Sequence, residues 1–365
     1  MTPSPGLSEA VATAAGSERP ARRMATRIGV RSSGLRLGFV NPEAWGFLKH
    51  LHAWLSTRHE TAVFAPRGTR APVFRERILR RRLHADMQAF LERHDVVFFE
   101  WASEMLALAT HLPKRCAVVA RLHRYELYAW ADRINWAAVD RIILVSAAKQ
   151  REFAGRFPDQ AHKTVVVPAG VPLQQFPFAE RTFSGSLGTL CHISPRKRVY
   201  ELLLALADPM REDPSLHLHV AGAPMPEYRD YYEALLRLVG RLGFDERVIF
   251  HGAVDSPWEW YPNIDVFISH SYSEGMQVAP VEAMASGCFT LSHDWEGSDE
   301  LLPADCRYVT DRELTARIAT YRDLPEAARQ QQRLRMRALA AERFDADRVH
   351  ERIDEIIQQC AGQDH

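Results

Sequence analysis

DVFISHSYSEGMQVAPVEAMASG, residues 265–287, contains a strand, a loop and a helix in one short stretch. Its first residues form an apolar run that is typical of a buried parallel strand, and the polar loop 271–275 follows. Pro280 suits the first turn of a helix, where its missing N–H costs nothing, and Gly287 suits the exit from that helix. We therefore predict that a short helix begins directly after the loop.

Apolar runs of similar length recur on both sides of this stretch, separated by sequence that is compatible with helices. The predicted strands lie at 35–40, 60–66, 95–101, 116–123, 140–146 and 163–170 in the first half of the chain, and at 188–194, 216–222, 247–253, 265–271 and 288–294 in the second. Strands that alternate with helices form βαβ units and parallel sheets. We predict an α/β fold of two Rossmann-like, doubly wound parallel-sheet domains facing each other across a cleft, where ligands of such folds bind.

The order of these elements divides the chain into five parts. Residues 1–33 are rich in Ala, Ser, Pro and Arg and lack the apolar run of a signal peptide, so we expect a disordered leader. Two Rossmann-like domains follow at 34–172 and 187–333, joined by a linker at 173–186. Residues 334–365 are expected to form a terminal helix that packs back toward the first domain.

Composition excludes several classes of protein. Lys plus Arg and Asp plus Glu are equal at 46 each, so no overall charge draws the chain to nucleic acid, which we do not expect as a partner. The five cysteines show no short paired spacing, which favours a reducing cytoplasm over a disulfide framework or a zinc site. No G-x-G-x-x-G follows the first strand and no Walker A loop occurs, which disfavours oxidoreductases and kinases.

The start of the helix within 265–287 has the chemistry of a diphosphate site. Its backbone N–H groups lack partners and carry partial positive charge, and Gly275 lets a phosphate approach the backbone closely. Glu274 follows the strand and could accept hydrogen bonds from sugar hydroxyls, while Glu282, about one turn into the helix, could accept from a ribose diol. The helix start also offers Met276, Gln277 and Val278 as donor-binding residues.

A second region supplies positive charge. GTLCHISPRKRVYELLLAL, residues 188–206, has Arg196, Lys197 and Arg198 between a predicted strand and a predicted helix. A reaction that expels a nucleoside diphosphate needs fixed cations where negative charge accumulates on the leaving group. We therefore group this basic cluster with the diphosphate site.

The stretch SEGMQVAPVEAMASG, residues 273–287, resembles the glutamate–seven–glutamate signature of the GT4 family of retaining GT-B glycosyltransferases. The resemblance implies a GT-B fold in which Glu274 faces the donor sugar and Glu282 holds the ribose. Lys197 matches a lysine of the family, but Cys191-His192 replaces its Gly-Arg pair and Arg198 replaces a glycine. Either one diphosphate cation is missing, or Arg196 or His192 supplies it.

The resemblance also implies a function. It points to a retaining transferase that moves a hexosyl unit from a nucleoside-diphosphate sugar of the UDP or GDP type to a glycan or lipid-linked acceptor. Glu274, Lys197 and His123 form the catalytic set, although His123 is equally compatible with a structural role. We expect no cofactor and no metal, because no clear Asp-x-Asp motif follows a strand. The alternatives are a GT-B-fold nucleotide-sugar epimerase and a non-catalytic nucleotide-sugar-binding scaffold.

FRERILRRRLHADMQAFLERH, residues 74–94, reads as a basic amphipathic helix. Two interpretations remain open for it. In the first, its apolar stripe packs into the core of the first domain and its charges face solvent. In the second, it rests on an anionic membrane and meets a lipid-linked acceptor there, which would place the cytoplasmic protein at the inner face of the membrane.

Overall fold

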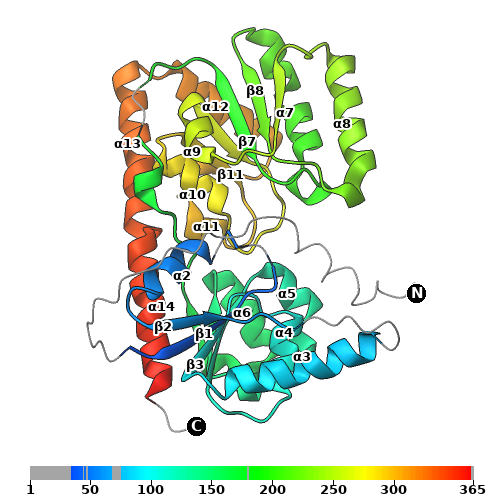
Figure 1. Cartoon of the computed structure of the whole chain (residues 1–365). Helices are drawn as coiled ribbons and strands as arrows, with labels where there is room; N and C mark the ends of the chain where they lie inside the picture. The colour runs from blue at the N-terminus through cyan, green and yellow to red at the C-terminus, as the bar shows by residue number, and fades with distance from the viewer. Residues whose placement is uncertain (1–33, 44, 47, 68–74, 179–180, 363–365) are drawn as a thin grey trace, which may run out of the picture.

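The computed structural model describes residues 34–43, 45–46, 48–67, 75–178 and 181–362. These residues form two lobes, each built on a six-stranded parallel sheet, with helices packed around it (Figure 1). The predicted leader at 1–33 lies outside the described residues.

The first sheet contains β1 (Arg36–Val40), β2 (Glu60–Val63), β3 (Val96–Phe99), β4 (Ala117–Leu122), β5 (Arg141–Leu144) and β6 (Thr164–Val166). All neighbours are parallel, in the order β2-β1-β3-β4-β5-β6, so the order reverses between β1 and β3. The helices of this domain are α2 (Lys49–Leu55), α3 (Arg75–Leu91), α4 (Glu104–Thr110), α5 (Arg124–Ala129) and α6 (Ala147–Arg156).

Side chains of this sheet alternate between two hydrophobic clusters. In β3, Val97 and Phe99 pack with residues of α3, α4 and α6, while Val96 and Phe98 pack on the opposite face with α2 and the last helix of the chain. All four side chains are fully buried. A strand covered on both faces reads as a continuous apolar run, which explains why β3 was visible in the sequence.

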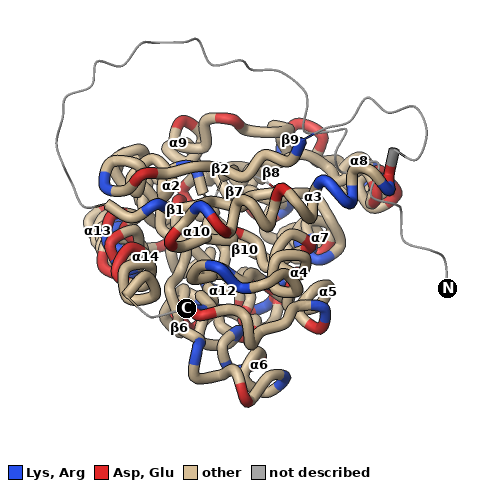
Figure 2. Tube along the Cα trace, turned by 60° about the horizontal axis from the view of Figure 1, so that its bottom comes forward, with Lys and Arg blue, Asp and Glu red and all other residues tan. Residues whose placement is uncertain are grey.

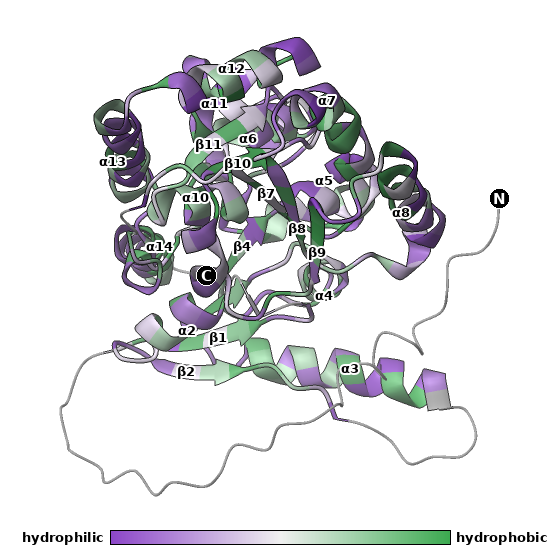
Figure 3. Ribbon diagram, turned by 90° about the horizontal axis from the view of Figure 1, so that it is seen from above, coloured by the Kyte–Doolittle hydropathy of each residue, from purple (hydrophilic) through white to green (hydrophobic). Residues whose placement is uncertain are grey.

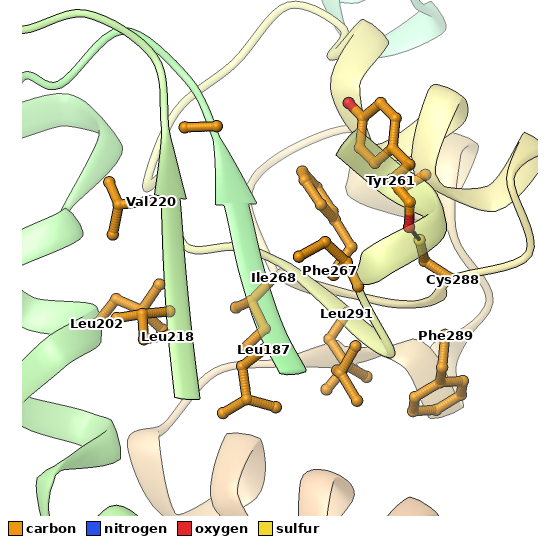
Figure 4. Close-up of a cluster of buried hydrophobic side chains, with 14 of the residues drawn as sticks. Leu187, Leu202, Leu218, Val220, Tyr261, Phe267, Ile268, Cys288, Phe289 and Leu291 are labelled. Atoms are coloured by element: carbon orange, nitrogen blue, oxygen red, sulfur yellow. Dashed lines mark hydrogen bonds between the residues drawn. The ribbon is translucent and has the colours of Figure 1, made fainter. Parts of the chain in front are cut away.

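The second sheet contains β7 (Ser186–Leu190), β8 (His217–Ala221), β9 (Val248–Gly252), β10 (Val266–Ser269), β11 (Phe289–His293) and β12 (Arg307–Tyr308). It is parallel in the order β12-β11-β10-β7-β8-β9. Its helices are α7 (Val199–Glu212), α8 (Arg229–Leu242), α9 (Pro257–Trp260), α10 (Val278–Ala285), α11 (Ser298–Leu301), α12 (Asp311–Asp323) and α13 (Glu326–Arg343). Figure 4 shows the centre of its core, where Leu187, Val220 and Phe267 of three strands are buried together.

The prediction of two doubly wound parallel-sheet domains is confirmed, while some strand ends differ. The strand expected at 188–194 begins at Ser186 and ends at Leu190, and the chain continues as a loop. The two-residue strand β12 was not predicted, because a segment that short carries no period of its own.

The terminal helix predicted at 334–365 is wrong as a single element. The structure has two helices, α13 and α14 (Ala346–Ala361), which run along one side of both lobes (Figure 1). The break occurs because the backbone of Val171, just before the linker, accepts a hydrogen bond from Ala346 N–H and donates one to Phe344 O. The side chain of Asp345 then caps α14.

The two helices pack on different domains. In α13, Met336 and Ala340 belong to the core of the second domain. In α14, Val349, Ile353 and Ile357 belong to a core cluster of the first domain. The C-terminal segment therefore crosses from the second domain to the first.

Candidate active site

The site is built where β10 and β7 lie side by side and the strand order of the second sheet reverses. In doubly wound sheets, ligands bind at this point, beyond the carboxyl ends of the strands. A first cavity of about 240 Å³ lies here. Its wall includes six of the predicted residues: Arg196, Lys197, Glu274, Met276, Gln277 and Val278.

Glu274 is buried at the centre of this group. Its Oε1 atom lies 2.7 Å from Lys197 Nζ and 2.6 Å from an Nη atom of Arg196. Burial alone would raise the pKa of Glu274, but the charges of Lys197 and Arg196 outweigh it, and the net pKa lies below its ordinary value. The Glu274 side chain is therefore an ionised carboxylate that forms ion pairs with both cations.

Gln277 fixes the geometry of the loop that carries Glu274. Its amide nitrogen donates to Glu274 Oε1 at 3.0 Å and to Ser271 Oγ at 3.2 Å. Its amide oxygen accepts from Ser269 Oγ at 2.6 Å. The two serines were not predicted as site residues, because serines are common in loops and nothing in their spacing distinguishes them.

Glu282 lies further along α10 and contacts Tyr261, the residue that follows α9. Its carboxylate accepts a hydrogen bond of 2.9 Å from the hydroxyl of Tyr261, which is fully buried. Burial raises the pKa of Glu282 to about 7, against the lowering effect of the Tyr261 hydrogen bond. Without a cation of its own, this carboxylate suits neutral donors such as the two hydroxyls of a ribose.

A second cavity of about 270 Å³ has Glu282 on its wall. Val278, the first residue of α10, lines both cavities. A ligand that reached from Glu274 to Glu282 would therefore pass the N-terminal end of α10, which carries partial positive charge.

Gly275 lies against the first domain. A Cβ atom at this position would approach Arg124 Cβ to 3.1 Å and Arg124 N to 3.3 Å, closer than most side chains tolerate. Arg124 Nε also donates to Ser273 Oγ at 2.9 Å. The structure thus gives Gly275 a role in the close approach of the two domains, in addition to the phosphate contact expected from the sequence.

His123 lies in a polar network of the first domain. It precedes α5, its Nε2 atom is 3.3 Å from Glu100 Oε1, and its ring packs against Trp101 with centroids 4.3 Å apart. Glu100 is fully buried and also accepts from Arg121 at 3.1 Å. The lining residues of the two cavities do not include His123.

The basic cluster is only partly assembled at the site. Arg196 and Lys197 line the first cavity, whereas His192 is exposed and is not one of its lining residues. Arg198 has a φ angle of 54°, and among the described residues no other non-glycine residue has a positive φ. Of the two residues that could supply the second diphosphate cation, the structure therefore places Arg196 at the first cavity and His192 outside it.

Two doubly wound domains with cavities between and beside them define a fold of the GT-B type. Crystal structures with this fold cover nearly the whole described chain. HepE of Anabaena in complex with UDP and glucose aligns with a TM-score of 0.71 at 18% identity, over 89% of this chain and 99% of that one. A glycosyltransferase from Rickettsia africae aligns with a TM-score of 0.75 at 12% identity, over 91% and 100%.

Residues 184–327 match the family model "Glycosyl transferases group 1". The match lies in the second domain and includes Glu274 and Glu282. The chain also resembles the D-inositol 3-phosphate glycosyltransferase of Nocardia farcinica, with 27% identity over 175 residues. A further relative is the alpha-monoglucosyldiacylglycerol synthase of Streptococcus pneumoniae, with 30% identity over 146 residues.

These sequence matches are partial. They cover 44% and 35% of this chain, and 39% and 32% of the two relatives. The chain thus matches about a third to two fifths of the length of these curated relatives.

Proposed function

We propose that the protein is a retaining glycosyltransferase that moves a hexosyl unit from a nucleoside-diphosphate sugar to a glycan or lipid-linked acceptor without a catalytic metal. The observation that carries the proposal is the contact of Glu274 with Lys197 and Arg196 on the wall of the first cavity. Both cations line the same cavity as Val278 at the N-terminus of α10, where a departing diphosphate would need positive charge.

The donor would bind across both cavities. Its diphosphate would lie at the start of α10, its sugar near Glu274 and its ribose at Glu282. Lys197 and Arg196 would turn from Glu274 to the phosphates as the donor enters. Because their charge neutralises the leaving group, the proposal needs no metal and no cofactor.

In the transfer, the bond between the anomeric carbon and the β-phosphate oxygen breaks, and its electron pair stays on the nucleoside diphosphate. The acceptor oxygen forms its bond to the same face of that carbon, and its proton passes to a phosphate oxygen. The anomeric configuration is retained. This route requires positioning and charge stabilisation from the protein rather than a nucleophile.

The donor base is proposed to be uracil or guanine. HepE, which shares the fold, was crystallised with UDP and with UDP-glucose. Of the relatives, one is a D-inositol 3-phosphate glycosyltransferase and one is an alpha-monoglucosyldiacylglycerol synthase. They agree with a hydroxyl acceptor on a small polyol, glycan or lipid, and they do not favour the epimerase or scaffold alternatives.

A contact with the inner face of the membrane, for a protein of the cytoplasm, is a further part of the proposal. The Lys and Arg residues of α3 are seen in Figure 2, and Figure 3 shows α3 at the edge of the first domain. Met87, Phe90 and Leu91 at its end are buried, whereas Arg80 and Arg81 are exposed. Among the described residues, none of the helices combines the length and apolar character needed to cross a bilayer.

The test is a panel of thermal unfolding curves with UDP, GDP, ADP and CMP, followed by a transfer assay with the matching nucleotide sugar. A ligand at ~100 times its dissociation constant adds ~2.7 kcal/mol to stability. We expect one nucleoside diphosphate to stabilise the protein and Glu282→Ala to lose this effect. Transfer should persist in EDTA and give a product of retained configuration by NMR. If no nucleotide binds, the proposal fails.

A further inference from the structure

The second cavity is walled by segments from both domains and from the C-terminal helix. The second domain provides Glu282, Val278 and Trp258, and the end of the first domain, just before the linker, provides residues 169–172. The remaining wall includes Arg121 of β4 and His350 of α14. Two polar side chains from outside the second domain therefore share a cavity with the carboxylate proposed to hold the ribose.

Both of these side chains are buried with an unpaired nitrogen. Arg121 is 3% exposed and donates to Glu100, but its Nε atom has no hydrogen-bond partner among the described residues. His350 is 7% exposed, and within the same part of the chain its Nδ1 atom has none either. A buried polar group without a partner costs about 1–3 kcal/mol, so these atoms favour a ligand or a water that pairs with them.

We propose that Arg121 and His350 contact the nucleoside of the sugar donor from across the cleft, so that the first domain and helix α14 take part in reading the base. This inference rests on the proposed function. A diphosphate at the start of α10 places the nucleoside in the second cavity, because Val278 lines both cavities and Glu282 lines the second. The apolar walls at Trp258 and Phe176 suit a planar base.

The two side chains differ in the hydrogen bonds that they can form. The guanidinium of Arg121 can only donate, so its partner must be a carbonyl oxygen or a ring nitrogen. Burial lowers the pKa of His350 to about 4, so its imidazole is neutral at pH 7 and can donate from one nitrogen and accept at the other. Uracil and guanine carry a carbonyl where cytosine and adenine carry an amino group. Arg121 can therefore donate to the carbonyl of uracil or guanine and to a ring nitrogen of adenine, and comparing UDP, GDP and ADP shows which base the cavity prefers.

The experiment uses isothermal titration calorimetry of the full chain with UDP, GDP, ADP and inorganic pyrophosphate. Pyrophosphate probes the phosphate site alone. The variants are His350→Phe, which keeps the ring and its packing near Trp54, and Arg121→Lys, which keeps a charge beside Glu100 but loses the planar fork. The matched control is Glu351→Ala, an exposed neighbour on α14.

Each variant is expected to weaken the preferred nucleotide about fivefold, the effect of one hydrogen bond, and to leave pyrophosphate binding unchanged. The control should alter neither. If both variants are folded by circular dichroism and bind the nucleotide as tightly as the unmodified chain, the inference is overturned. An equal loss for pyrophosphate also overturns it, because the effect then lies outside the nucleoside. If the unmodified chain binds no nucleotide, the proposed function itself has failed.

Discussion

The carboxylate of Glu300 in the second domain accepts a hydrogen bond of 2.6 Å from the backbone N–H of Ala147 in the first domain. Its other oxygen accepts from Ala148 at 2.8 Å. Ala147 is the first residue of α6, so the negative charge lies at the positive end of that helix. Together with the bond from Arg124 to Ser273, this contact joins the two domains beside the loop that carries Glu274.

Replacing Glu300 by Ala should loosen this junction. Two charge-assisted hydrogen bonds are lost, and we expect the free energy of unfolding to fall by about 2 kcal/mol. The domains should also separate more often, which small-angle scattering would detect as a larger radius of gyration. Asp299→Ala, an exposed carboxylate next to Glu300 in the sequence, is the control. Unchanged scattering and stability in Glu300→Ala would show that the contact does not hold the domains together.

Glu274→Gln should separate binding from catalysis. Glu274 holds Lys197 and Arg196 by its negative charge, so the amide frees both cations for a diphosphate. We expect the nucleoside diphosphate to bind at least as tightly as before, while kcat falls about 100-fold. Lys197→Ala should instead weaken the nucleotide about tenfold. Calorimetry and initial rates measure the two effects, and a weaker nucleotide in Glu274→Gln would contradict the competition between carboxylate and phosphate.

Stability should depend on the ionisation of Glu282. Burial raises its pKa from 4.5 to about 7 in the folded protein, so the folded state binds the proton more tightly than the unfolded state does. Its contribution to stability is therefore full below about pH 4.5 and is lost as the pH rises through about 7, with an upper limit of about 3 kcal/mol. Urea unfolding at pH 5.5 and pH 8 would measure the fall. Glu282→Gln should remove part of it, and an identical fall in that variant would assign it to other groups.

The membrane contact of α3 is tested by Arg80→Glu, Arg81→Glu and Arg82→Glu together. Each basic residue near an anionic surface contributes about 1 kcal/mol, so reversing three charges should abolish sedimentation with vesicles that contain phosphatidylserine. Neutral phosphatidylcholine vesicles are the control for charge. If the unmodified protein does not sediment with either kind of vesicle, or the variant sediments equally, the membrane interpretation is wrong.

The parts of the fold that were predictable are those in which local pattern and packing agree. The apolar run around β3 is buried on both faces, and the strand–loop–helix unit at 265–287 contains its own start and stop signals. The break between α13 and α14 was not predictable, because it depends on hydrogen bonds to Val171, far away in the sequence. The candidate site likewise has a part that the sequence predicts and a part that it does not. Glu274 and Lys197 carry a motif, whereas Arg121 and His350 reach the second cavity only through the packing of the two domains.

Arg198 has a left-handed backbone at a position where the GT4 motif has a glycine. The family's glycine is replaced by arginine, yet the backbone keeps a φ of 54°, a conformation that costs a residue with a side chain about 1 kcal/mol. The charge of Arg198 also contributes, after burial, to lowering the pKa of His270 to about 3. His270 lines the first cavity, so Arg198 adds positive charge near the phosphate site while its backbone is strained.

Arg198→Gly should therefore make the protein more stable and the site weaker. Relief of the left-handed strain, less the entropy that glycine adds to the unfolded chain, should raise the free energy of unfolding by up to about 0.5 kcal/mol. Loss of the charge should weaken pyrophosphate binding about threefold, as expected for a cation near the phosphates without direct pairing. Arg237→Gly, at an exposed position inside α8, is the contrast and should lose about 1 kcal/mol. A loss of stability in Arg198→Gly would mean that contacts of the arginine side chain outweigh the strain of its backbone.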